Sequence, residues 1–120
     1  MIYLASQFTC TKYLDDAANA RIEQSRYEAA LKATAFGIRK GHTVYSPIVH
    51  GYHVERVFRI GGNWHTWARH STDMLRRASV LGILTLHDWE ESEGITAELE
   101  LAQTLNIPVR HYDTFFDEVL

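Results

Sequence analysis

The sequence VLGILTL at residues 80–86 is an almost uninterrupted run of apolar residues. Such a run is typical of a strand that is covered on both faces, as in the parallel sheet of an α/β protein. A strand with one face in water would instead alternate apolar and polar residues. This segment therefore predicts a central strand in a sheet with helices packed on both sides.

Segments with helical periodicity lie on either side of this strand along the chain. Asn63 and Ser92 are residue types that favour the first position of a helix, and each precedes apolar residues at spacings of three and four. A Gly after two cations favours the end of an earlier helix near residue 40. The predicted helices cover residues 21–40, 64–77 and 92–106, with a terminal helix from residue 113.

Three further strands are expected, which makes helices and strands alternate along the chain. The predicted strands cover residues 1–5, 42–46, 80–86 and 107–112. Residues 48–62 show no clear periodicity and are interpreted as a long loop that can act as a lid. The whole chain, residues 1–120, is expected to be one domain.

This alternation favours a three-layer α/β/α sandwich with a small, mostly parallel four-stranded sheet, similar to flavodoxin-like and Rossmann-like folds. We expect the strand order 2-1-3-4. Right-handed crossovers then bring the loops after the strands to one edge of the sheet, where ligands bind in such folds. Residues 3–7, 46–50 and 87–94 are predicted to meet there.

The composition excludes several classes of function. The chain is 46% hydrophobic and 22% charged, with a formal net charge of −3 that gives no attraction to long nucleic acids. Its only cysteine, Cys10, cannot form an internal disulfide, and no membrane or targeting segment is visible, so a cytoplasmic location is expected. The common fingerprints for nucleoside triphosphates and dinucleotides are absent, and no cofactor is predicted.

The segment from residue 88 to residue 99, DWEESEGITAEL, is the most informative for chemistry. A strand end runs into a helix through Ser92 and Gly94, and Glu98 lies a turn inside that helix. Free N–H groups of the first turn suit a phosphate or a sugar hydroxyl. Because three other glutamates crowd the same place, an uncharged sugar is easier to accommodate than a phosphate.

Several other polar or aromatic residues fall on the predicted ligand-binding edge. Aromatic rings suit flat heterocycles, and Trp89 is favoured over Trp64 and Trp67 because it lies at the loop edge. The seven histidines form no HExxH motif, and no metal site is predicted. The predicted substrate-binding residues are Ser6, Gln7, Ser46, His50, Trp89, Ser92 and Gly94.

The chain also resembles a known superfamily over nearly its whole length. IYLAS at residues 2–6, the segment DMLRRASV at 73–80, and SEGITAE at 92–98 followed by AQTLNIPV at 102–109 are similar to the nucleoside 2-deoxyribosyltransferases. GHTVYSPIVH at 41–50 and the element WEES at 89–92 resemble, more closely, a short family of unknown function that phages and prophages often encode.

The resemblance implies site residues and an activity. In the superfamily, the position of Glu98 is that of the nucleophile that attacks the anomeric carbon of the sugar. The position of Tyr3 is that of the residue that orients this carboxylate, and the position of Asp73 is that of an acidic residue that contacts the base. We therefore expect Tyr3, Asp73 and Glu98 to converge on one cavity. The resemblance also implies that a second subunit completes the site, so a homodimer or higher homo-oligomer is expected.

The expected function is a nucleoside or nucleoside 5′-monophosphate N-glycosidase or 2-deoxyribosyltransferase. Cleaving an N-glycosidic bond builds positive charge on the sugar and negative charge on the base, which a carboxylate and an acid stabilise. Two alternatives remain open. The chain can be a non-catalytic module that binds nucleotides or signalling nucleotides, or a phage accessory protein that acts through protein contacts.

Overall fold

Parallel strand pairing forms the centre of the protein. The computed structural model describes residues 1–60 and 64–120. Within these residues one four-stranded sheet has the order β2-β1-β3-β4, and all neighbouring strands are parallel, which confirms the predicted sheet. The strands are β1 (Ile2–Ala5), β2 (Val44–Tyr45), β3 (Val80–Leu84) and β4 (Val109–Tyr112).

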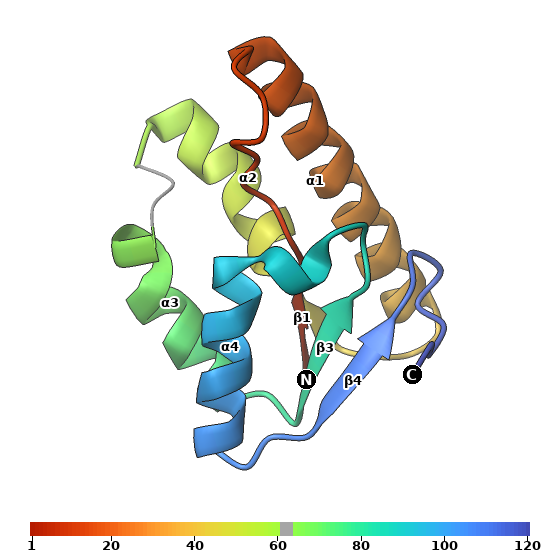
Figure 1. Cartoon of the computed structure of the whole chain (residues 1–120). Coiled ribbons are helices and arrows are strands. Elements are labelled where there is room, and N and C mark those ends of the chain that lie inside the picture. Colours follow the sequence, from red (N-terminus) through yellow and green to blue (C-terminus); the bar gives the residue numbers. More distant parts are fainter. Residues whose placement is uncertain (61–63) are drawn as a thin grey trace.

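Two apolar cores cover the two faces of the sheet. Along β1, Ile2 and Leu4 point into the core under α1, whereas Tyr3 and Ala5 point into the core under α3 and α4. Figure 1 shows α3 and α4 together on one side of the strands and α1 on the other. The helices of the described chain are α1 (Asp16–Arg39), α2 (Pro47–Phe58), α3 (Trp64–Arg76) and α4 (Glu93–Thr104), with the short 3-10 helix η1 (Trp89–Glu91).

The predicted loop over residues 48–62 is wrong for most of its length, because α2 occupies residues 47–58. Ser46 caps this helix by accepting a hydrogen bond from Val49 N at 3.2 Å. Pro47 occupies the first turn of the helix, where its missing N–H costs nothing. Asn63, the predicted cap of α3, lies outside the described residues.

The predicted terminal helix from residue 113 is also wrong. The Asp113 carboxylate accepts hydrogen bonds from the N–H groups of Phe115 (2.8 Å) and Asp117 (3.1 Å), which folds the chain into a turn. Phe116 is in the left-handed region, with φ of 63°, and its ring stacks on Tyr112 at 4.3 Å. Local side-chain hydrogen bonding therefore outcompetes helix formation here.

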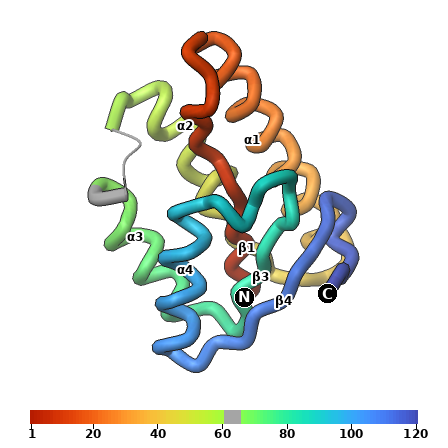
Figure 2. Tube along the Cα trace, viewed as in Figure 1, coloured from red at the N-terminus to blue at the C-terminus, as the bar shows by residue number. Residues whose placement is uncertain are grey.

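The predicted meeting of loops at one edge of the sheet is visible in the chain trace. Figure 2 shows the chain after β1 and the segment that contains η1 at the same end of the sheet, whereas the amino terminus lies at the other end. The helix predicted from residue 21 begins earlier, at Asp16, because Asp15 caps it. No helix in the described part of the chain is long and apolar enough to span a membrane.

Gly82 of β3 gives a test of the sheet packing. A Cβ at this position would lie 3.0 Å from the Tyr112 ring and 3.2 Å from Ile2 Cγ2. Because these buried groups have little room to move, we expect Gly82→Ala to destabilise the protein by about 1–3 kcal/mol. Urea unfolding measures this value. Gly94→Ala is the matched control, since its Cβ would meet only Ser92 Oγ at 3.8 Å, and equal stability of the two variants would contradict this account.

Candidate active site

A cleft of about 1060 Å³ opens at the carboxyl end of the sheet. Its size is comparable to the upper end of pockets that hold small organic ligands, roughly 300–1,000 Å³. The walls come from the segment after β1, from the first turns of α2, and from the segment where η1 leads into α4. Trp67 and Ser71 of α3 and Arg26 of α1 complete the lining.

Glu98 is the most unusual group in this cleft. It lines the cleft from α4, but only 7% of its surface is exposed. Burial disfavours the charged form and raises the pKa of its carboxyl to about 7, while the nearby Tyr3 hydroxyl acts in the opposite direction. Such a carboxyl can hold or release a proton at neutral pH, and its ionised form can attack an electrophilic carbon.

Two tyrosines lie near Glu98, and they differ in burial. Tyr3 is fully buried, and burial and the Glu98 carboxyl both raise its pKa above the usual value. Its hydroxyl makes no hydrogen bond of standard geometry to any described residue, although its closeness to Glu98 favours the carboxylate. Tyr45 packs on Tyr3 at 5.6 Å, and burial raises its pKa to about 12. Tyr3 and Glu98 are therefore brought together.

Ser6 and Gln7 line the cleft directly after β1. The Ser6 hydroxyl is buried and has no hydrogen-bond partner within residues 1–60 and 64–120. The Gln7 amide, oriented with Nε2 toward the β3–η1 loop, donates to the carbonyl oxygens of His87 (3.0 Å) and Asp88 (3.1 Å). Gln7 thus holds two walls of the cleft together, whereas Ser6 keeps an unpaired polar atom.

Ser92 and Gly94 lie in the cleft wall at the start of α4, near Glu98. Ser92 Oγ accepts a hydrogen bond from Ile95 N at 3.2 Å, so the predicted helix cap is confirmed. Gly94 has open space beside its Cα, because the nearest atom to an added Cβ is Ser92 Oγ. A ligand can therefore approach the backbone closely at this point.

Five predicted site residues do not line the cleft. Tyr3 is one of them, because it is fully buried beneath the cleft wall. Asp73 is exposed, and it lies two residues from Ser71, so it leaves α3 in a direction away from the cleft. His50 is exposed on α2, and its ring stacks on that of His70 at 5.0 Å. Ser46 is used as the α2 cap. Trp89 packs against the core on the α3 and α4 side and against His111.

Aromatic side chains that the sequence did not single out as site residues line the cleft instead. Phe8 and Tyr52 belong to it, and their rings meet edge to face at 5.9 Å. Trp67 packs against Gly51, where an added Cβ would lie 3.4 Å from its ring. The signal for Tyr52 was present in the sequence, because Ile48 and Tyr52 are four residues apart, but the segment was interpreted as a loop.

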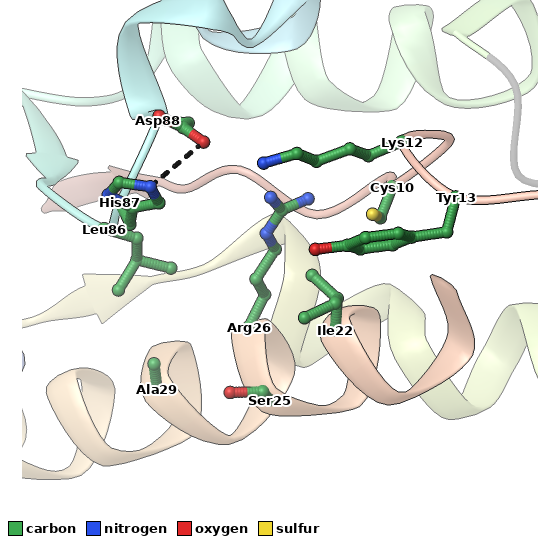
Figure 3. A pocket seen from close by; sticks show the side chains of 10 residues that line it. All are labelled: Cys10, Lys12, Tyr13, Ile22, Ser25, Arg26, Ala29, Leu86, His87 and Asp88. Carbon is green, nitrogen blue, oxygen red and sulfur yellow. Dashed lines mark ion pairs between the residues drawn. The ribbon is translucent and has the colours of Figure 1, made fainter. Parts of the chain in front are cut away.

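Charge is distributed unevenly along the cleft. Of the described lining residues, five are acidic and two, Lys12 and Arg26, are basic. Both basic residues also line a smaller cavity of about 260 Å³ on the α1 side, in which their side chains lie near the His87 and Asp88 pair (Figure 3). Arg26 Nη1 donates to the carbonyl oxygens of Phe8 (3.1 Å) and Thr9 (2.9 Å), so its guanidinium is already engaged.

The opposite end of the cleft is acidic. Glu91, Glu93 and Glu98 line the large cleft and take no part in the smaller cavity. Neither Glu91 nor Glu93 forms an ion pair with a described residue, and both side chains are exposed. No group of three or more His, Cys, Asp or Glu side chains in the described chain is placed to hold a metal ion.

The raised pKa of Glu98 predicts how stability depends on pH. Between about pH 4.5, the ordinary value, and about pH 7, the folded state binds more protons at this site than the unfolded state. Below about pH 4.5 the raised pKa therefore contributes about 3 kcal/mol to the free energy of unfolding. This contribution is lost as the pH rises to about 7. We expect Glu98→Gln to remove this loss. Urea unfolding at several pH values in this range measures the free energy of unfolding of the unmodified protein and of Glu98→Gln, and Glu100→Gln is the exposed control. If the free energies of the unmodified protein and Glu98→Gln changed equally with pH, the assignment to Glu98 would be wrong.

Sequence comparison places the chain in a family. No curated protein matches it. A family described as "Domain of unknown function (DUF1937)" matches residues 1–114. This match includes every strand of the described sheet and all the residues that line the cleft. The chain therefore belongs to the DUF1937 family.

Proposed function

We propose that this protein cleaves the N-glycosidic bond of a nucleoside, as a hydrolase or a pentosyltransferase, with Glu98 as the nucleophile. The observation that carries the proposal is the buried Glu98 carboxyl at the wall of a ligand-sized cleft, with the Tyr3 hydroxyl behind it. The resemblance of the segments around Tyr3 and Glu98 to the nucleoside 2-deoxyribosyltransferases supports the same assignment.

In the proposed reaction, the Glu98 carboxylate attacks the anomeric carbon of the sugar. The bond from this carbon to the base nitrogen breaks, and its electron pair leaves with the base. Water, or a second base, then attacks the same carbon and releases the Glu98 carboxylate. Tyr3 acts as a positioning residue, because its hydroxyl favours the ionised carboxylate from the buried side.

The charge of the cleft favours a nucleoside over its 5′-monophosphate. Gly94 lets a sugar approach the backbone closely, but Glu91 and Glu93 line the cleft beside it. A phosphate placed there would meet negative charge, whereas uncharged sugar hydroxyls would not. Ser6 Oγ is buried and has no partner among the described residues, so a sugar hydroxyl that reaches it would supply the missing hydrogen bond.

A binding module without turnover is the second candidate. The observation that favours it is the position of Asp73, which is exposed and does not line the cleft. A neutral base needs a proton as it leaves, and Asp73 is not placed to provide one within a single copy of the chain. Under the catalytic proposal, a neighbouring copy in a homo-oligomer or another acid must serve this purpose.

Base release from a panel of nucleosides tests the proposal. We expect the protein to liberate free base and Glu98→Gln to reduce kcat/KM by roughly 10³-fold or more, because the nucleophile is removed while its shape is kept. Chromatography of the products measures the rate. Glu100→Gln, an exposed carboxylate on the same helix, is the matched control. Thermal stabilisation by nucleosides without any base release would favour the binding module instead.

The dependence of rate on pH provides a separate test. Because Glu98 must be ionised to attack, we expect kcat/KM to rise with pH through about 7, the pKa of its carboxyl. Tyr3→Phe removes a hydroxyl that lowers this pKa, so the midpoint of the profile should move to higher pH. A purely structural role for Tyr3 would change stability and leave this midpoint in place.

A further inference from the structure

We infer that the favoured substrates are N-glycosides whose base carries a positive charge, such as pyridinium ribosides. This inference rests on the proposed function and specifies its substrate class. It depends on three features of the cleft: the negative charge of Glu91 and Glu93 beside Glu98, a buried polar atom that has no partner among the described residues, and the position of Asp73.

The negative charge is concentrated where the sugar and base would lie. Glu91 and Glu93 line the cleft next to Ser92 and have no ion pair within the described residues. The basic residues Lys12 and Arg26 lie toward the smaller cavity that Figure 3 shows. Neither of them forms an ion pair with Glu91 or Glu93, and Arg26 is held by its bonds to two carbonyl oxygens. A cation in the cleft is therefore attracted to this end.

Ser6 indicates independently that a ligand occupies the same cleft. Its side chain lines the cleft, only 7% of the residue is exposed, and its hydroxyl has no partner in the part of the chain that the structure describes. Buried hydroxyls are nearly always hydrogen-bonded, so a bound molecule is the expected partner. The rings of Phe8 and Tyr52 in the same walls are already engaged within the chain, because the Arg56 guanidinium lies 5.3 Å from the Phe8 ring centre and 3.8 Å from that of Tyr52. The attraction for a cationic ligand therefore comes from the acidic residues.

The chemistry of the leaving group leads to the same substrate class. A neutral base leaves as an anion unless an acid protonates it, and Asp73 does not line the cleft. A pyridinium base needs no proton. When Glu98 attacks the anomeric carbon, the electron pair of the glycosidic bond moves to the ring nitrogen, and a neutral pyridine departs. Water then hydrolyses the glycosyl ester and yields the free sugar, the carboxylate and one proton.

Substrate comparison on the intact protein tests this inference. Nicotinamide riboside is the cationic probe, and inosine and thymidine are the neutral ones. For each substrate, kcat/KM is divided by the rate constant of its uncatalysed hydrolysis. We expect this ratio to be about tenfold or more higher for nicotinamide riboside than for inosine or thymidine. In Glu91→Gln/Glu93→Gln its KM should rise by about three- to tenfold at low salt, with no change for the neutral nucleosides.

The control variant Glu90→Gln/Glu100→Gln removes the same net charge from exposed positions that do not line the cleft. We expect its KM for nicotinamide riboside to stay near that of the unmodified protein, and an equal rise in both double variants would overturn the inference. Glu98-dependent base release from inosine or thymidine, with none from nicotinamide riboside, would overturn it and leave the proposed function standing. If no substrate in the set is cleaved, both fail.

Discussion

The parallel pairing of β1 with β3 is the constraint on which the rest of the structure depends. Residues 2–5 of β1 pair in register with residues 80–83, and both strands are buried between two layers of helices. Because side chains alternate along a strand, this register places Tyr3 on the same face as α4. It also brings the segments after both strands to one edge, where the cleft opens.

The sheet could be predicted because its signals are local and strong. The apolar run at residues 80–86 identifies a strand that is covered on both faces, and the alternation of helices and strands restricts the topology to few arrangements. The two errors have a common cause. Pro47 and Asp113 are each compatible with a break or with the start of a helix. The cap that Ser46 provides favours the helix at Pro47, whereas the bonds that the Asp113 carboxylate accepts favour a turn.

The site could be predicted only in part. Glu98, Ser92 and Gly94 were identifiable because a strand, a cap and a helix follow one another within a few residues, and this order fixes their relative positions. Phe8, Tyr52 and Trp67 come from three separate elements, and their approach depends on how α2 and α3 pack. The direction of Asp73 depends on the rotation of α3 about its axis, which the burial of Ser71 and Leu75 sets.

The burial of Glu98 connects the stability of the fold to its chemistry. A carboxylate with little exposed surface and no ion-pair partner among the described residues destabilises the folded state, and the group takes up a proton instead. A positive charge that enters the cleft shifts this balance, because it favours the ionised form that the proposed reaction requires. A neutral ligand that only displaces water would favour the protonated, unreactive form. Binding and activation therefore reinforce each other for a cationic ligand, and they oppose each other for a neutral one.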